Sequence, residues 1–314
     1  MRELLVVKSG GPAAFVEWQA AFAAVAPGLE LALWGDPALD PARITHALVW
    51  DPEPGALARL PALEVIFGAG AGVDAIIADA ELPRHIPLVR MGVEGAAQRM
   101  GEYVAWAALG LLRDQRRLAI AQAASRWDYF EPENTAPERV VGIMGLGVMG
   151  TRAATMLQGL GFGVVGWSRT EKFVPGVRSF VGDAELAAFL AESDILVVLL
   201  PATEATRGLI AAPLLACAKP GAGLILAGRG TQAVIPDILA ALDAGQLSGA
   251  VIDVFDPEPL AADSPVWAHP KVTVTPHCAS LPSRRERAAY VAEVMARHRR
   301  GEALPNLYDP LRGY

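Results

Sequence analysis

The chain has 314 residues, of which 53% are hydrophobic and 19% charged, and its net charge is −7. A chain of this length predicts about two domains, and its apolar content excludes an intrinsically disordered protein. The acidic balance argues against a nucleic-acid-binding protein, which usually carries a basic surface. Basic residues do cluster between 284 and 300, but glutamates are interleaved with them on a predicted helix, which indicates a solvated helix face.

The amino terminus and the cysteines indicate where the protein works. The first residues, MRELLVVKSGG, predict a strand and not a signal peptide. The longest clearly apolar stretch, 195–200, is far shorter than the roughly 20 residues that a membrane helix needs. Cys217 and Cys278 are far apart in the sequence, so they predict neither a disulfide framework nor a thiolate zinc site. We therefore expect a cytoplasmic protein that binds neither membrane nor nucleic acid and holds no metal.

The first part of the chain alternates strand-like and helical segments. A helical pattern covers 14–25, and the predicted strands are 3–7, 29–34, 46–50, 63–67 and 87–91. This alternation is typical of parallel α/β layers. A long helical pattern from about 98 to 124 follows, which we expect to cross between domains, and the Pro-rich, charged segment after it is a predicted loop.

A second α/β series begins near residue 139. Its predicted strands are 139–144, 163–167, 194–200, 223–228, 249–255 and 271–277, and its predicted helices are 148–160, 183–192, 214–218 and 234–245. The fully apolar run at 194–200 is typical of a strand buried on both faces of a parallel sheet. A last helix, roughly 283–300, is expected to return to the first domain.

A glycine-rich turn lies between the first strand and the first helix of this second series. It consists of Gly145, Leu146, Gly147, Val148, Met149 and Gly150. A GxGxxG pattern in this context predicts a dinucleotide site, with glycines for the tight turn, for backbone approach to the pyrophosphate and for helix–strand packing. The pyrophosphate would lie at the helix N-terminus, where free N–H groups favour an anion.

The next strand ends in Trp167-Ser168-Arg169-Thr170. An NAD site places Asp or Glu at this point to bind the ribose 2′-OH. Ser168, Arg169 and Thr170 instead offer hydroxyl groups and a guanidinium suited to a 2′-phosphate. The sequence therefore favours NADP, with NADPH preferred over NADH.

Four further features follow predicted strands. The segment 67–74, FGAGAGVD, offers several backbone N–H groups for an anion. Arg229 follows another strand, Glu258 lies in DVFDPEPL, and His277 ends the strand 271–277. Each is unremarkable alone, but ligands bind at the carboxyl ends of such sheets, so Arg, Glu and His together predict a catalytic site.

Six ordered motifs resemble those of the D-isomer-specific 2-hydroxyacid dehydrogenases. They are GAGVD (70–74), GLGVMG (145–150), PATEAT (201–206), GRG (228–230), DVFDPEPL (253–260) and TPH (275–277). WSRT, SPVWAHPKVTVTPH and the terminal RGY resemble the branch of the glyoxylate/hydroxypyruvate reductases of type A. The resemblance covers nearly the whole chain. It implies NADPH-dependent reduction of small 2-oxo acids, glyoxylate and hydroxypyruvate among them.

The resemblance implies an α/β architecture of two Rossmann-like, doubly wound parallel-sheet domains, with the active site in the interdomain cleft. Residues 1–98 and 282–314 would form the substrate domain, and residues 99–281 the dinucleotide-binding domain. A homodimer is also implied. Trp127, in the loop after the long helical pattern, then either reaches a neighbouring subunit's site or is a plain surface or interface aromatic side chain.

The resemblance also implies roles for matching residues. His277 would protonate the carbonyl oxygen, Glu258 would pair with the imidazole, and Arg229 would bind the 2-oxo acid and polarise its carbonyl. Backbone N–H groups near the loop residues Gly70, Ala71 and Gly72 would hold the substrate carboxylate, with Trp50 as a further substrate contact or a buried core side chain. The implied cofactor contacts outside the two turns are Leu200, Pro201, Thr206, Gly228 and Asp253, the last at the nicotinamide amide.

Two alternatives remain. GLGVMG also occurs in β-hydroxyacid dehydrogenases, but there it lies near the N-terminus, whereas about 140 residues precede it here. The second alternative is a non-catalytic NAD(P)-sensing protein, similar to the corepressors that are related to the dehydrogenase family. The presence of Arg229, Glu258 and His277 argues against this alternative. One position departs from the family pattern, because Leu226 stands where an Asn is common.

Overall fold

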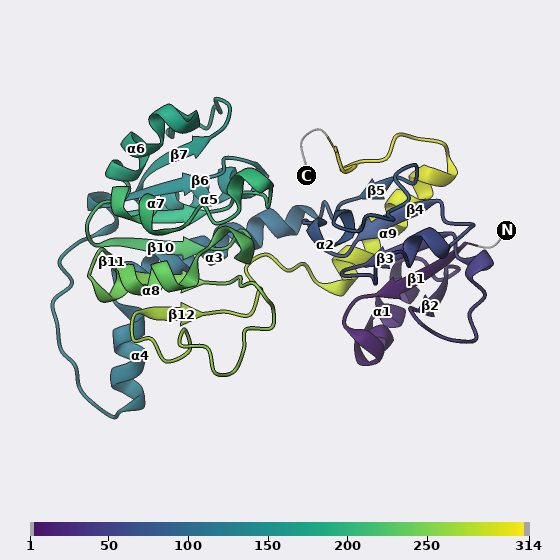
Figure 1. Cartoon of the computed structure of the whole chain (residues 1–314), viewed down its shortest axis with the longest axis horizontal. Helices are drawn as coiled ribbons and strands as arrows, with labels where there is room; N and C mark the ends of the chain where they lie inside the picture. The colour runs from purple at the N-terminus through teal and green to yellow at the C-terminus, as the bar shows by residue number, and fades with distance from the viewer. Residues whose placement is uncertain (1–2, 311–314) are drawn as a thin grey trace. The chain divides into compact units, whose positions relative to one another are not determined.

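The computed structural model describes residues 3–310 and divides into two compact units (Figure 1). Unit 1 comprises Met1–Gly95 and Pro282–Tyr314, and unit 2 comprises Ala96–Leu281. The first division falls at residue 95, where the sequence led us to expect 98, and the second falls after residue 281. The terminal RGY motif lies outside the described residues.

Unit 1 contains a five-stranded parallel sheet in the order β2-β1-β3-β4-β5. Its strands are β1 (Leu4–Lys8), β2 (Glu30–Leu33), β3 (His46–Val49), β4 (Val65–Gly68) and β5 (Leu88–Val89). Because all strands run in the same direction, their amino ends lie at one edge of the sheet and their carboxyl ends at the other.

Both faces of this sheet are covered. The helices α1 (Gly11–Val25) and α9 (Arg284–Arg299) pack against one face, where Trp18 and Phe22 of α1 are fully buried. The short helix α2 (Asp74–Ile77) and neighbouring loops cover the other. Burial of each large apolar side chain contributes about 1.5–3 kcal/mol. The return of α9 to this sheet makes the two sequence segments of unit 1 one folding unit.

Unit 2 contains a seven-stranded parallel sheet in the order β12-β11-β10-β9-β6-β7-β8. The strands are β6 (Val140–Met144), β7 (Gly163–Ser168), β8 (Arg178–Val181), β9 (Ile195–Val198), β10 (Ala222–Leu226), β11 (Leu247–Ile252) and β12 (Val272–Val274). The chain runs outward from β6 through β7 to β8 and then returns to β9 on the other side of β6. The carboxyl ends of β6 and β9 therefore form the topological switch point, where open α/β sheets bind ligands.

Helices cover both faces of the second sheet. One face packs against α3 (Glu94–Leu112) and α5 (Val148–Gly159). The other packs against α6 (Gly182–Glu192), α7 (Ala212–Cys217) and α8 (Ile235–Asp243). The four residues of β9 are all buried, as the apolar run there predicted. Two α/β units built on parallel sheets are thus what the alternating pattern indicated.

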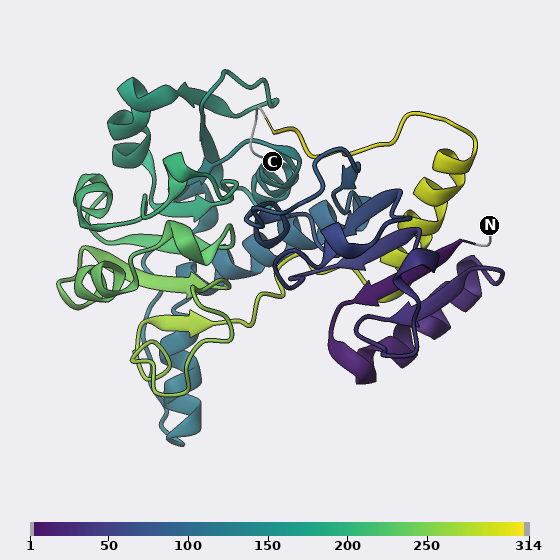
Figure 2. The same cartoon turned by 45° about the vertical axis from the view of Figure 1, so that its right-hand side comes forward.

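The expectation of one continuous helix over 98–124 is wrong. It is divided into α3 and α4 (Gln115–Ala123), with Asp114 between them at φ 51°, ψ 41°. This left-handed conformation ends an α-helix, and aspartate tolerates it better than most residues because its short polar side chain bonds locally. Both views show α4 extending away from the seven-stranded sheet, with the following loop returning to β6 (Figures 1 and 2).

Two other expectations need correction. The strand β8 was missed, because Arg178–Val181 is short and begins with a charged residue. The basic cluster of α9 is not a uniformly solvated face, since Arg287 is only 6% exposed. Its guanidinium lies over the Trp18 ring, 4.7 Å from the ring centroid, so an aromatic face replaces part of its hydration. No helix in residues 3–310 is long and apolar enough to cross a membrane.

Candidate active site

The glycine-rich turn follows β6 directly and leads into α5. Gly145 has a φ of 104°, and a Cβ there would lie 2.8 Å from the Leu199 carbonyl oxygen. A Cβ on Gly150 would lie 1.9 Å from the Gly145 carbonyl oxygen. Nothing lies within 4 Å of a Cβ on Gly147, so the fold itself does not exclude a side chain there. This turn leaves the first residues of α5 open to an approaching anion.

The other members of the turn differ in exposure. Leu146 is buried against Gly166 of β7, where a Cβ would lie 2.3 Å from its side chain. Val148 is exposed and Met149 is half-buried. The turn is thus anchored by Leu146, while Gly147 and Val148 face the surroundings.

The end of β7 carries the polar residues Ser168, Arg169 and Thr170. Ser168 is buried, and its Oγ donates to the Thr170 carbonyl oxygen at 2.7 Å, which closes the loop on itself. Arg169 and Thr170 are exposed. The loop therefore offers a guanidinium and a hydroxyl group, and no carboxylate, within residues 168–170.

The loop after β9 is held by Thr206, which belongs to a short 3₁₀ turn, η4 (Glu204–Thr206). Its Oγ1 lies within hydrogen-bond distance of two carbonyl oxygens, that of Pro201 at 2.8 Å and that of Thr203 at 3.1 Å. It also accepts from the Thr203 N–H at 2.9 Å. Leu200 is buried and Pro201 half-buried beside this loop. Thr206 thereby fixes the loop at the switch point.

The loop that carries Arg229 is pinned by the fully buried Gln232. The Gln232 Oε1 accepts from the Arg229 N–H at 2.9 Å, and its Nε2 donates to the carbonyl oxygens of Leu200 and Pro201, both at 3.0 Å. The Arg229 guanidinium donates to the Gly228 carbonyl oxygen at 2.8 Å. One buried amide side chain thus joins the loops after β9 and β10.

Both glycines that flank Arg229 are required by close packing. A Cβ on Gly228 would lie 2.3 Å from the Gln232 Oε1, and one on Gly230 would lie 2.0 Å from the backbone of Phe255. The GRG segment therefore lies directly against the start of the loop that carries Glu258.

His277 and Glu258 form a direct pair. The distance from His277 Nδ1 to Glu258 Oε2 is 2.7 Å, and Glu258 Oε1 accepts from the Phe255 N–H at 2.9 Å. The two side chains are 32% and 35% exposed, respectively. A carboxylate bound to Nδ1 fixes the ring orientation and directs Nε2 away from the pair.

Asp253, which is 1% exposed, organises the segment that contains His277. Its Oδ1 accepts from the Thr275 hydroxyl at 2.6 Å and from the Cys278 N–H at 2.9 Å, while Oδ2 accepts from the Ala279 N–H at 2.9 Å. The His277 N–H donates to the Asp253 carbonyl oxygen at 2.8 Å. His277 has a φ of 51°, a conformation that these surrounding bonds support.

Tyr103 of α3 extends this network. Its hydroxyl lies 2.7 Å from the Thr275 Oγ1. Because the single Thr275 proton goes to Asp253, Tyr103 is the donor in this contact. Burial raises the pKa of Tyr103 well above its ordinary value, so the proton is retained.

The predicted substrate residues of unit 1 lie at the carboxyl edge of its sheet. Trp50 follows β3 and is 44% exposed, so it is not a core side chain. Its ring covers Gly70, where a Cβ would lie 2.4 Å from Trp50 Cζ3. Ala71 is exposed and Gly72 half-buried. Arg287 lies beneath this loop and donates to the Ala69 carbonyl oxygen at 3.3 Å, and burial lowers its pKa to about 10.

Two residues of this site, Gln232 and Tyr103, were missed from the sequence, and Thr275 was noted only as part of the TPH motif, without a role of its own. Gln232 had a usable signal, because it stands three residues after Arg229 in GRGTQ, the spacing of a capping box. Tyr103 had none, since it is one of many aromatic or apolar residues on a predicted helix. Leu226, at the position where the family pattern has Asn, is a fully buried member of the core of unit 2.

The chain matches a protein-family model described as "D-isomer specific 2-hydroxyacid dehydrogenase, NAD binding domain", over residues 105–279. This segment lies wholly within unit 2 and contains every residue described above for that unit except Tyr103.

Curated and solved relatives agree with that match. The chain is 41% identical over 293 residues to glyoxylate/hydroxypyruvate reductase A of Klebsiella pneumoniae (strain 342), covering 92% of this chain and 93% of that protein. It is similar to a D-isomer specific 2-hydroxyacid dehydrogenase of Xanthobacter autotrophicus Py2 in complex with NADPH and MES, with a TM-score of 0.91, 40% identity and full coverage of both chains. An NADPH-dependent glyoxylate/hydroxypyruvate reductase of Sinorhizobium meliloti, in complex with NADP and sulfate, also gives a TM-score of 0.91, with 38% identity and full coverage of both chains.

Proposed function

Because the chain belongs to the D-isomer specific 2-hydroxyacid dehydrogenase family, we propose that it is an NADPH-dependent reductase of small 2-oxo acids, glyoxylate and hydroxypyruvate among them. The observation that carries this proposal is the 2.7 Å contact between His277 Nδ1 and Glu258 Oε2. This pair could donate a proton, and it lies at the carboxyl edge of the seven-stranded sheet, the edge that also carries the glycine-rich turn. The chain is similar to reductases of these acids.

The residues present fit a phosphorylated dinucleotide. The open backbone at Gly147 and the start of α5 suit the pyrophosphate, and the exposed guanidinium of Arg169 suits a 2′-phosphate. Thr170 and the buried Ser168 complete this subsite. The structural relatives in complex with NADPH or NADP support the same choice. When bound, the nicotinamide supplies the hydride.

His277 acts as the general acid. With Nδ1 held by Glu258, its Nε2 carries the proton that is donated to the carbonyl oxygen of the substrate. Glu258 fixes the orientation of the ring, and Asp253 holds the backbone N–H groups of His277 and Cys278. The contact between Asp253 and the nicotinamide amide stays a prediction. The Asp253 carboxylate already accepts three hydrogen bonds, and it can accept one more.

Arg229 binds the 2-oxo acid and polarises its carbonyl group. Gln232 fixes the Arg229 backbone and Gly228 accepts one of its N–H groups, so the guanidinium starts from a defined position. A preorganised cation next to a developing oxyanion costs no reorganisation during the reaction.

We assign the substrate carboxylate to the loop Gly70–Gly72 of unit 1, with Trp50 as a further contact. Arg287 supports this assignment, because its buried positive charge lies directly behind the loop and favours an anion at the backbone N–H groups. Trp50 lies over Gly70 and limits the size of the group that enters there. Unit 1 is thus the substrate domain and unit 2 the dinucleotide-binding domain.

We further propose that the protein is a cytoplasmic homodimer. The unpaired thiols of Cys217 and Cys278 are typical of a reducing compartment. Apolar side chains are exposed on α3, on α4 and in the loop after it, namely Trp106, Leu109, Leu118, Trp127 and Tyr129. Trp127 is 94% exposed, which is unusual for a tryptophan outside an interface. Light scattering of the purified protein measures this directly.

One assay tests the reductase proposal. Oxidation of NADPH and of NADH is followed with glyoxylate, hydroxypyruvate, pyruvate and longer 2-oxo acids. We expect turnover of glyoxylate and hydroxypyruvate with NADPH. In His277→Ala we expect a loss of turnover while NADPH binding, measured by fluorescence, is retained. Tight NADPH binding without turnover of any 2-oxo acid would support the NAD(P)-sensing alternative instead.

A further inference from the structure

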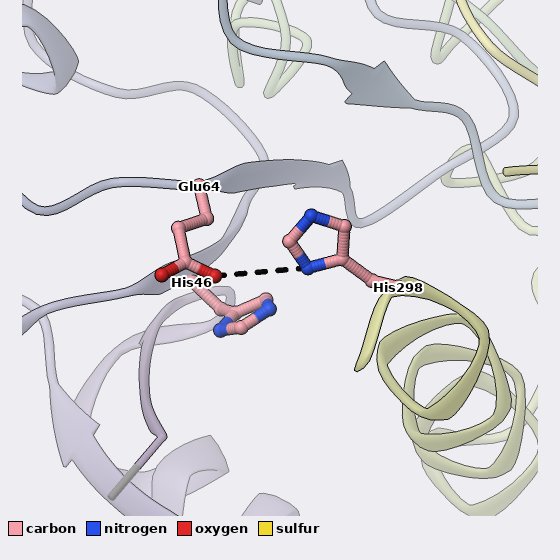
Figure 3. Close-up of side chains that lie close together, drawn as sticks. All are labelled: His46, Glu64 and His298. Atoms are coloured by element: carbon pink, nitrogen blue, oxygen red, sulfur yellow. Dashed lines mark ion pairs between the residues drawn. The ribbon is translucent and has the colours of Figure 1, made fainter. Parts of the chain in front are cut away.

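Three metal-ligand side chains from distant parts of the sequence meet at the amino-terminal edge of the sheet in unit 1. They are His46, Glu64 and His298, and their ligand atoms all lie within 4.8 Å of one another (Figure 3). The His298 Nδ1 lies 3.7 Å from Glu64 Oε2, and the two imidazole rings are edge to face with centroids 5.8 Å apart. The carboxyl edge of the same sheet carries Trp50 and Gly70, so this cluster is separate from the proposed substrate loop.

We propose that His46, Glu64 and His298 bind a divalent transition metal ion, zinc in the first place. Two imidazoles and one carboxylate are a ligand set that zinc takes in three-ligand sites, where water completes the coordination. Bonds of roughly 2.0–2.2 Å place donors about 3.4 Å apart in a tetrahedron. The Glu64–His298 distance of 3.7 Å already approaches this value, and the ligand atoms of all three residues lie within 4.8 Å of one another.

The second observation is an unpartnered nitrogen. His46 is 0% exposed, and its Nε2 has no hydrogen-bond partner within the described part of the chain. A buried polar atom without a partner costs about 1–3 kcal/mol, so such an atom calls for a ligand. The cluster therefore contains an unsatisfied nitrogen beside two partly exposed side chains through which an ion can enter.

The hydrogen-bond partners of His46 fit the tautomer that a metal ligand needs. Its Nδ1 lies 2.8 Å from the Thr45 Oγ1, which also accepts from the Leu4 N–H at 3.1 Å and donates to the Leu4 carbonyl oxygen at 3.3 Å. When the Thr45 proton goes to the Leu4 carbonyl oxygen, the His46 Nδ1 donates to Thr45, and Nε2 carries the lone pair that a metal ion would bind. Histidines that bind metals donate their other ring N–H to a neighbouring group in this manner.

The surrounding charges permit a cation. Glu64 contributes a negative charge, and His298 lies in the last turn of α9, where the helix dipole favours positive charge. The positive charge of Arg299, next to His298 in the sequence, opposes the binding of a cation, but Arg299 forms an ion pair with Glu3 that offsets this charge. A bound ion would connect α9 to the segment before β4 and to β3, and so link the two sequence segments of unit 1.

The test uses the full chain after removal of metal with a chelator. Zinc is titrated against a chromophoric competitor, and cobalt(II) is added as a spectroscopic probe of four-coordinate geometry. We expect one equivalent of zinc per chain, visible cobalt absorption and a higher melting temperature with zinc. Glu64→Gln and His298→Ala, both at partly exposed positions, should each weaken zinc binding at least tenfold without loss of fold. His46→Gln is the third variant, with its fold checked by circular dichroism.

The matched control is His85→Ala, which removes an exposed histidine of the same unit outside the cluster. It should bind zinc as the wild type does. No saturable binding by the wild type would overturn the proposal, as would equal affinity of the wild type, Glu64→Gln and His298→Ala. Glyoxylate reduction by these two variants should match the wild type, so metal binding and reductase activity are judged independently.

Discussion

The hydroxyl group of Thr275 donates to the buried carboxylate of Asp253 at 2.6 Å, two residues before the proposed general acid His277. Tyr103 donates to the same Thr275 oxygen, so a chain of two hydrogen bonds runs from α3 to the Asp253 carboxylate. The carboxylate in turn holds the N–H groups of Cys278 and Ala279. The position of His277 therefore depends on a buried carboxylate group that holds the backbone of the two residues after it, while the Asp253 carbonyl oxygen holds the His277 N–H.

Thr275→Val should lower both stability and turnover. It removes a hydrogen bond to a buried carboxylate, which is worth about 2 kcal/mol of unfolding free energy. Because small misplacements of a reacting group are costly, turnover should fall between about 10- and 100-fold. Urea unfolding and steady-state kinetics with glyoxylate measure the two effects. Tyr103→Phe removes only the outer bond and should cost about 1 kcal/mol.

Thr273→Val is the control for this variant. It lies on β12, the strand that Thr275 directly follows, and is half-buried like Thr275. It should leave turnover at the wild-type value. Equal effects of the two threonine substitutions would contradict the role given to the Thr275–Asp253 bond.

Gly230→Ala should impair catalysis through packing alone. The added Cβ would lie 2.0 Å from the backbone of Phe255, so the loops carrying Arg229 and Glu258 must move apart. A displacement of about 1 Å can reduce turnover about 100-fold, and we expect an effect of that size. The measurement is kcat with NADPH and glyoxylate, combined with a check of cofactor binding, which should persist.

Gly159→Ala is the matched control for the glycine substitution. Gly159 ends α5, and nothing lies within 4 Å of its added Cβ. This variant should keep full activity and gain up to about 1 kcal/mol of stability, because alanine loses less conformational freedom in a helix. If Gly230→Ala behaved as Gly159→Ala does, the close approach at Phe255 would have no catalytic importance.

The sequence predicted the architecture well where local patterns and packing agree. The apolar run of β9 and the strand–glycine–helix order around Gly147 both have one simple structural interpretation, and the structure contains both elements. It failed where a pattern continues through a break, as at Asp114, since helical periodicity alone does not register a left-handed residue. It also failed for Arg287, because a cation that packs on Trp18 is buried by tertiary contacts.

The candidate site shows the same division. Arg229, Glu258 and His277 each stand in a recognisable motif near the end of a predicted strand, so the sequence predicted them as site residues. The contact of Tyr103 joins residues 172 positions apart, which no local pattern contains. Gln232 has a local capping-box spacing from Arg229, but that spacing does not predict its bond to Pro201, 31 positions away. The cluster of His46, Glu64 and His298 joins the two ends of the chain, and its members have no common motif.

Arg169→Asp should change the cofactor preference. An exposed guanidinium at this turn would contact the 2′-phosphate that NADPH has and NADH lacks. Loss of a charge-assisted bond of about 1.5–3 kcal/mol predicts a fall of roughly 10- to 100-fold in kcat/KM for NADPH. The value for NADH should change little. Arg59→Asp in unit 1 makes the same change in net charge at an exposed position and should affect neither cofactor.

The two cofactors must be compared at constant ionic strength, because salt screens an exposed charge. Equal losses for NADPH and NADH in Arg169→Asp would show that this residue supports the fold of the turn and does not select the phosphate. A change in Arg59→Asp as large as that in Arg169→Asp would indicate a general charge effect.

Asp194 should make the stability of unit 2 depend on pH in the acid range. Burial by itself raises the pKa of this carboxyl, but bonds from Lys219 at 2.7 Å, the Val140 N–H at 2.8 Å and Arg139 at 3.0 Å outweigh it and lower the pKa below its ordinary value. The folded state then binds fewer protons than the unfolded state near that value. The stabilisation is complete above the unfolded pKa, about 3.9, and is lost as the pH falls through the lower folded pKa.

The measurement is the free energy of unfolding in urea at several values between pH 7 and pH 3. The wild type should lose stability more steeply below about pH 4 than Asp194→Asn, which lacks the titrating group but is less stable at neutral pH. Asp263→Asn, at an exposed position, should follow the wild-type curve. Parallel curves for the wild type and Asp194→Asn would place the acid sensitivity in other carboxyl groups, and the bonds from Lys219 and Arg139 would then not depress the titration of Asp194.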